Sequence, residues 1–151
     1  MLARLWAARS CTGMADEHVL NVMYAEAGGH GGHFDGAEAV VTLMLQPSLG
    51  GGQFEYVPQL RSADDENPEC VRCLLQGNRS GIRSMYGAAG TLALFCGHFS
   101  PHRVATVTGP RPRIITVLSY ASSPDPRLSA HVKQLSMVGL TDRVLACVAG
   151  W

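Results

Sequence analysis

The stretch GGHGGHFDGAEAVVTLMLQ, residues 28–46, gathers two histidines and an aspartate in a glycine-rich turn beside an apolar run. Glycine lets the backbone turn tightly at such a point. Side chains two residues apart on a β-strand point to the same face, so His33 and Asp35 can present an imidazole and a carboxylate to one point. His30 is expected to be spare, because its spacing from Asp35 gives no strand register that would align the two side chains. The pattern indicates a strand that carries metal-binding groups.

A third metal ligand must come from elsewhere in the chain. The segment GHFSPHRV, residues 97–104, offers His98 and His102. His102 heads a β-branched run, which fixes its direction, whereas His98 follows a glycine in a turn and is expected to be exposed to solvent. Two histidines and one carboxylate on one face of a metal, with the other positions open, are typical of non-haem iron(II) oxygenases. The sequence therefore predicts a metal centre made of His33, Asp35 and His102.

Short β-rich runs recur between glycine, proline and serine residues, which predicts a sandwich or barrel of short strands. The candidate strands are residues 18–24, 39–46, 53–57, 91–95, 102–108 and 113–120. Between the third and fourth, a helix is expected to begin at Pro68 and end near Gly77. We expect the region from Gln59 to Gly90 to be a crossover or a lid.

Composition narrows the class of partner. The 151 residues suit one domain. Twelve basic and twelve acidic residues cancel without a basic stripe, which gives no case for nucleic acid or an anionic membrane. No apolar stretch is long enough to span a bilayer, so a soluble protein with a small-molecule partner is expected. The oligomeric state stays open.

The five cysteines are odd in number and irregularly spaced, which argues against a secreted disulfide framework and favours a cytoplasmic location. Cys70 and Cys73 form a lone CxxC pair. A structural zinc site needs four ligands, so these thiols are expected to be incidental.

Longer segments carry a resemblance to a known family. These are MYAEAGGHGGHFD (residues 23–35), VTLMLQPSLGGGQFEYVP (residues 41–58) and GTLALFCGHFSPHRVATVTGPRPRIITVLSY (residues 90–120). Together they resemble the ligand, strand and arginine segments of 2-oxoglutarate- and Fe(II)-dependent dioxygenases of the prolyl-hydroxylase-like type, near the free-amino-acid hydroxylases and halogenases. The resemblance implies a mainly β fold, a double-stranded β-helix of the jelly-roll or cupin-like kind, with a few flanking helices.

The resemblance also implies an activity. Fe(II) held by His33, Asp35 and His102 would act with 2-oxoglutarate as co-substrate and O₂, with ascorbate as a possible accessory. The products would be succinate, CO₂ and a small molecule or amino-acid-like substrate hydroxylated at a C–H bond. Halogenating relatives replace the carboxylate with a small residue, so Asp35 favours hydroxylation.

The far carboxylate of 2-oxoglutarate needs a buried cation, and a planar guanidinium binds a carboxylate with two parallel hydrogen bonds. Arg111 and Arg113 are the candidates. Arg113 is preferred because it heads a strand, whereas Arg111 lies in a turn between two prolines. Tyr24 corresponds to the tyrosine ahead of the family's first ligand, and it serves either as a donor to 2-oxoglutarate or as packing.

The predicted organisation has three parts: an irregular or artificial N-terminus over residues 1–17, the dioxygenase core barrel over 18–122 and a flanking helical segment over 123–151. Family members carry further elements ahead of the tyrosine strand, so an N-terminal truncation is expected. Two other functions stay open. One is a catalytically idle barrel that acts as a binding module, and the other is a cupin-like metal hydrolase, for which an arginine at this spacing is not needed.

Overall fold

The computed structural model describes residues 18–25 and 30–120. Over this part the chain forms ten β-strands and one α-helix, and every strand pair is antiparallel. The strands make two four-stranded sheets and one two-stranded pair. The predicted mainly β class is confirmed. No sheet closes on itself within the described ranges.

The first sheet has the order β1-β10-β3-β7. Its strands are β1 (His18–Met23), β10 (Arg113–Tyr120), β3 (Ala39–Gln46) and β7 (Leu92–Phe95). Successive side chains of a strand point to opposite faces, and β3 shows this: Val40 and Met44 are buried, whereas Leu45 is exposed. The predicted ranges 39–46 and 113–120 match β3 and β10, and the other two predicted strands are one residue longer than observed.

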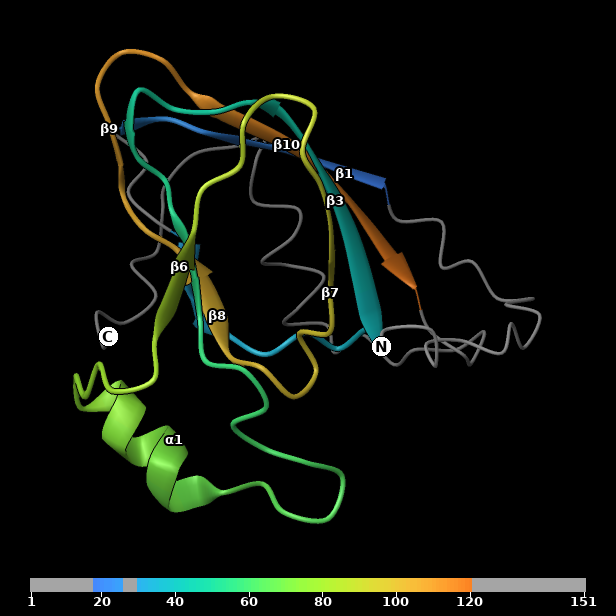
Figure 1. Ribbon diagram of the computed structural model, residues 1–151, viewed down its shortest axis with the longest axis vertical. Coiled ribbons are helices and arrows are strands. Elements are labelled where there is room, and N and C mark those ends of the chain that lie inside the picture. Colours follow the sequence, from blue (N-terminus) through green and yellow to red (C-terminus); the bar gives the residue numbers. More distant parts are fainter. Residues whose placement is uncertain (1–17, 26–29, 121–151) are drawn as a thin grey trace, which may run out of the picture.

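The second sheet has the order β2-β8-β5-β6. Its strands are β2 (His30–His33), β8 (His102–Val104), β5 (Phe54–Tyr56) and β6 (Arg83–Met85). Figure 1 labels β1, β3, β7 and β10 of the first sheet and β6 and β8 of the second. A short pair joins β4 (Gly50–Gly51) to β9 (Val107–Thr108). The single strand predicted over 102–108 is therefore wrong, because the chain leaves β8 at Ala105 and pairs with a different strand from Val107 onward.

Of the observed strands, β2 was expected only as a strand that carries both His33 and Asp35, without stated bounds, and β4 and β6 were not predicted. The strands β2 and β4 are rich in glycine, which is depleted in strands because it packs no side chain. They form because a partner strand is available: β2 pairs with β8, and β4 pairs with β9. Tertiary pairing thus overrides local propensity here.

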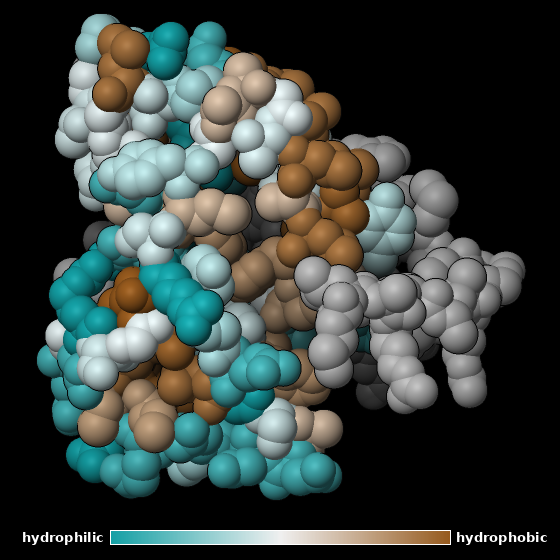
Figure 2. Space-filling model, in the orientation of Figure 1, coloured by the Kyte–Doolittle hydropathy of each residue, from teal (hydrophilic) through white to brown (hydrophobic). Residues whose placement is uncertain are grey.

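Aromatic rings join the two sheets. Phe95 of β7 lies edge-on to Phe54 of β5, with ring centroids 4.9 Å apart, and edge-on to the imidazole of His102, at 4.8 Å. Such edge-to-face pairs add to the free energy gained by burial. A hollow near the middle of the face drawn in Figure 2 is bordered by apolar residues. The core therefore lies between the sheets, next to a cavity.

The helix α1 (Pro68–Leu75) confirms the predicted helix. Pro68 stands in the first turn, where the missing N–H costs nothing, and Gly77 follows with a positive φ of 92°. The helix lies outside the space between the two sheets (Figure 1). Cys70 and Cys73 are both free thiols on it.

Two predicted segments fall outside the described residues, namely the N-terminus over 1–17 and the flanking helical segment over 123–151. Within the described part, α1 is too short and too polar to cross a bilayer.

Candidate metal centre

Pairing between β2 and β8 brings two distant histidines together. His33 and His102 are cross-strand partners, and such directly opposed residues carry their side chains on the same face of a sheet. Their ring centroids are 4.3 Å apart, with an angle of 56° between the ring planes. The sheet register therefore fixes the relative position of both imidazoles.

Asp35 reaches the same point by a different route. The strand β2 ends at His33, and Asp35 lies in the loop that follows. The prediction that His33 and Asp35 share one face of a single strand is therefore wrong, because Asp35 lies beyond the end of β2. Instead, the backbone N–H of Asp35 donates a hydrogen bond to the carbonyl of Gly97, at 3.1 Å. Contact with a turn far along the chain directs this carboxylate.

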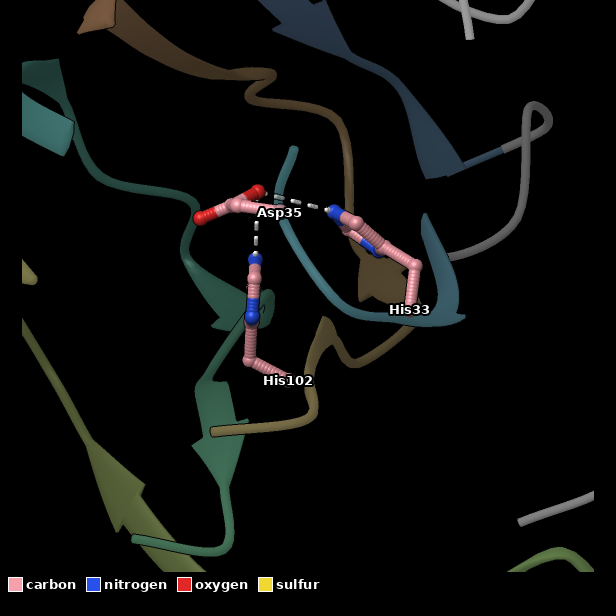
Figure 3. A group of neighbouring side chains, drawn as sticks. All are labelled: His33, Asp35 and His102. Atoms are coloured by element: carbon pink, nitrogen blue, oxygen red, sulfur yellow. Dashed lines mark ion pairs between the residues drawn. The ribbon is translucent and has the colours of Figure 1, made fainter. Parts of the chain in front are cut away.

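The three side chains converge (Figure 3). Oδ1 of Asp35 lies 3.6 Å from Nε2 of His33 and 3.4 Å from Nε2 of His102. One possible ligand atom from each residue lies within 4.8 Å of the others. Two neutral nitrogens and one carboxylate oxygen are a donor set that suits a first-row divalent metal.

Backbone carbonyls fix which imidazole nitrogen faces the centre. Nδ1 of His33 lies 2.9 Å from the carbonyl oxygen of Gly31, and Nδ1 of His102 lies 3.0 Å from that of Ser100. A carbonyl only accepts, so each Nδ1 carries the proton and donates it. In the neutral ring, Nε2 then keeps its lone pair for a metal, which is the usual arrangement around metal-binding histidines.

The surroundings also favour neutral imidazole at His33. Burial lowers the pKa of His33 below its usual 6.5, and the nearby His102 lowers the pKa further. The hydrogen bond to Gly31 and the charge of Asp35 act in the opposite direction and are weaker. Because a metal binds the neutral ring, a lowered pKa keeps His33 available to a metal at lower pH.

A glycine makes room for the carboxylate. A β-carbon added at Gly97 would lie 1.8 Å from Oδ2 of Asp35 and 2.8 Å from Cε1 of His102. Both distances are shorter than any real contact to a β-carbon. The absence of a side chain at position 97 is therefore a condition for the observed position of Asp35.

The centre opens into a cavity of about 270 Å³ between the two sheets. Arg113, at the start of β10, lines this cavity and is only 4% exposed. Burial lowers the pKa of its guanidinium. Among the described residues, its Nε has no hydrogen-bond partner. A buried cation with an unused donor in a cavity is suited to an anionic ligand.

The other candidates have different positions. Arg111 is exposed, and Tyr24 is 55% exposed and does not line the cavity. The expectation of a solvent-exposed His98 is wrong, because this residue is half-buried and its Nδ1–H donates to the carbonyl of Asp35, at 3.2 Å. His30 begins β2, and its side chain is not described.

Sequence reasoning missed the supporting residues. Gly97 and the buried Ser100 position Asp35 and His102, but glycine and serine are common in any turn, so neither gave a distinctive signal. From the predicted lid, Met85, Tyr86 and Gly87 line the cavity.

Comparison with known proteins places this geometry in a family. No curated protein matches the chain. The family described as halogenase D matches residues 7–138, which include both sheets and every residue of the metal centre. The chain therefore belongs to the halogenase D family.

Proposed function

We propose that this chain is an Fe(II)- and 2-oxoglutarate-dependent oxygenase that hydroxylates a C–H bond of a small-molecule or amino-acid-like substrate. The observation that carries the proposal is the convergence of His33, Asp35 and His102 in a cavity that also contains the buried Arg113. A hydrolytic centre would not need that arginine.

The donor set fits iron. Both imidazoles turn Nε2 toward the carboxylate, and three protein donors on one side leave other positions free for small ligands. Bound Fe(II), together with 2-oxoglutarate and O₂, would supply the oxidising power needed to break an unactivated C–H bond. The three side chains hold the metal, and Gly31 and Ser100 orient the two rings.

Arg113 fits the remote carboxylate of 2-oxoglutarate. A carboxylate drawn out of water is costly to bury unless it is paired and hydrogen-bonded. Arg113 supplies a buried charge and an Nε–H that no described residue accepts. The lining of the same cavity includes the apolar residues Val40, Met44 and Ile115, and an apolar environment strengthens the pairing of opposite charges.

We also propose that the two four-stranded sheets are the two halves of a double-stranded β-helix. Their strands are antiparallel, and residues from both sheets line the cavity. A jelly roll of this kind places a ligand site between its sheets.

Anaerobic titration with Fe(II) and 2-oxoglutarate tests the proposal. We expect a weak visible charge-transfer band that requires both components, and succinate release once O₂ and a substrate are added. The His102→Ala variant should give neither signal. A wild-type protein that binds Fe(II) without any effect of 2-oxoglutarate would contradict the co-substrate assignment.

Halogenation is the second candidate, and the family match favours it. The resemblance described above implies that halogenating relatives carry a small residue in place of the carboxylate, so Asp35 favours hydroxylation. Assays with chloride present should therefore give a hydroxylated product from the wild-type protein. The Asp35→Gly variant should lose hydroxylation and gain a chloride-dependent product, whereas full hydroxylase activity in that variant would contradict the role of Asp35 on the metal.

A further inference from the structure

Arg61 lies close to the metal-binding segment although it follows a different strand. Its side chain is 19% exposed, and its guanidinium carbon stands 3.9 Å from the centroid of the Phe34 ring. Phe34 is the residue between His33 and Asp35. A cation over an aromatic face is attracted by the ring, more strongly where water is excluded. Arg61 therefore holds the residue between two metal-binding side chains.

Arg61 also binds the turn Gly97–Ser100. Its Nε–H donates to the carbonyl of His98, at 2.8 Å, and its backbone N–H donates to the carbonyl of Phe99, at 3.3 Å. A guanidinium has a rigid planar set of donors, so it can stack on a ring and bond to a carbonyl at once. Arg61 thus joins this turn to Phe34.

The same turn contacts two members of the metal centre. Asp35 donates its N–H to Gly97 and accepts a hydrogen bond from the ring of His98 at its carbonyl. The carbonyl of Ser100 accepts a hydrogen bond from Nδ1–H of His102. Because Asp35 lies beyond the end of β2, no strand ladder holds it, and these contacts replace the ladder.

We propose that Arg61 is a positioning residue for the metal centre: it clamps Phe34 to the Gly97–Ser100 turn and so fixes the direction of the Asp35 carboxylate. The role rests on the proposed metal site. Groups that orient metal ligands typically contribute about 10- to 100-fold to metal affinity. Arg61 acts through other residues and makes no contact with a ligand atom of the centre in the described structure.

A simpler role is a surface ion pair. The Nη1 of Arg61 lies 2.8 Å from a carboxylate oxygen of Glu66, but Glu66 is 73% exposed. Exposed pairs of this kind contribute little. The ion pair and the clamp can be separated by substitution, because Glu66→Gln removes the first and leaves the second.

Cobalt(II) binding to the metal-free protein is the test, because the visible bands of cobalt(II) report ligand geometry as well as affinity. We expect Arg61→Ala to weaken cobalt(II) binding by about 10- to 100-fold and to change the bands of the loaded protein. Arg61→Lys should restore part of the affinity, because it keeps a cation near Phe34 but loses the planar donors. Glu66→Gln, and Arg72→Ala on the exposed face of α1, are the matched controls and should bind as the wild-type protein does.

Phe34→Leu completes a double-mutant cycle. If the clamp exists, the loss from Arg61→Ala and Phe34→Leu together should be smaller than the sum of the two single losses. Thermal unfolding of each metal-free variant separates a loss of folding from a loss of ligand geometry. If Arg61→Ala does not fold, the same cycle is measured with Arg61→Lys in its place, together with Phe34→Leu.

Three outcomes would overturn the role. If Arg61→Ala binds cobalt(II) with wild-type affinity and shows wild-type bands, the positioning role is overturned but the metal centre is not. Additive losses of affinity in the double-mutant cycle would have the same meaning. Failure of the wild-type protein to bind cobalt(II) would overturn the metal centre itself, and the role with it.

Discussion

At the scale of single residues, position 97 sets how much room the Asp35 carboxylate has. Gly97 is buried, and its backbone lies in a region of conformation that alanine also adopts, since its φ is not positive. An added methyl group would therefore cause no backbone strain. Its effect comes from the contacts with Oδ2 of Asp35 and Cε1 of His102.

We expect Gly97→Ala to lower the free energy of unfolding by about 1–3 kcal/mol, the usual cost of overpacking. The same substitution in an Asp35→Gly background should cost much less, because the main clash is gone. Chemical denaturation of the four proteins measures both values. An equal loss in the two backgrounds would show that the methyl group does not press on Asp35.

Arg113 and Arg111 form a matched pair, one buried and one exposed. Removing a buried charged hydrogen-bond partner costs roughly 2–5 kcal/mol, so Arg113→Ala should weaken 2-oxoglutarate binding by about 30-fold to several thousand-fold. Arg113→Lys should recover only part, because a point charge replaces a planar fork. Arg111→Ala should have a small effect. Binding constants for 2-oxoglutarate check this, and the reverse order would overturn the assignment to Arg113.

At the scale of elements, a buried carboxylate ties β5 to its neighbours. Glu55 on β5 is 8% exposed and pairs with Arg103 of β8, at 2.6 Å, and with Arg79 of the segment after α1, at 2.9 Å. Burial acts to raise the pKa of Glu55, but the hydrogen bonds and charges of Arg103 and Arg79 together outweigh it, so the pKa lies below the usual 4.5. The group thus holds the outer face of the second sheet together.

We expect Glu55→Gln to lower the free energy of unfolding by about 1.5–3 kcal/mol at neutral pH, the range for hydrogen bonds to charged groups. Because the folded-state pKa is depressed, this contribution is complete above pH 4.5 and is lost as the pH falls through the lower folded-state value. Wild-type and variant stabilities should therefore converge in acid. Glu69→Gln, in the exposed pair of α1, is the control and should cost no more than about 0.5 kcal/mol. A constant gap at every pH would contradict the ion-pair explanation.

At the scale of the whole molecule, the metal centre lies where the first sheet, the second sheet and two loops meet. Its candidate ligands come from β2, from the loop after it and from β8. A metal that binds only the folded chain stabilises it according to the ratio of its concentration to Kd.

We expect cobalt(II) or anaerobic Fe(II) to raise the unfolding temperature of the protein, and EDTA to reverse the rise. At a free metal concentration of 100 times Kd, the stabilisation is about 2.7 kcal/mol. His102→Ala should lose the rise while keeping a cooperative transition. Equal rises in wild-type and variant proteins would indicate binding elsewhere on the chain.

The sequence by itself determined the mainly β class of the fold and the choice of His33, Asp35 and His102 as candidate metal ligands. The segments that become β3 and β10 are β-rich runs between glycine, proline and serine residues, and that signal is local, so their bounds follow from the sequence. The same holds for α1, where proline and glycine mark the ends. The histidine and aspartate candidates could be recognised from their residue types, because few side chains bind a metal.

Only the tertiary structure decided how those side chains meet. The register that opposes His33 to His102 comes from pairing between β2, whose glycines give no strand signal, and a strand far along the chain. The position of Asp35 depends on the Gly97–Ser100 turn and on Arg61. These contacts are long-range, and a sequence pattern reports what a residue prefers locally, whereas burial and hydrogen bonding with distant partners decide where its side chain lies.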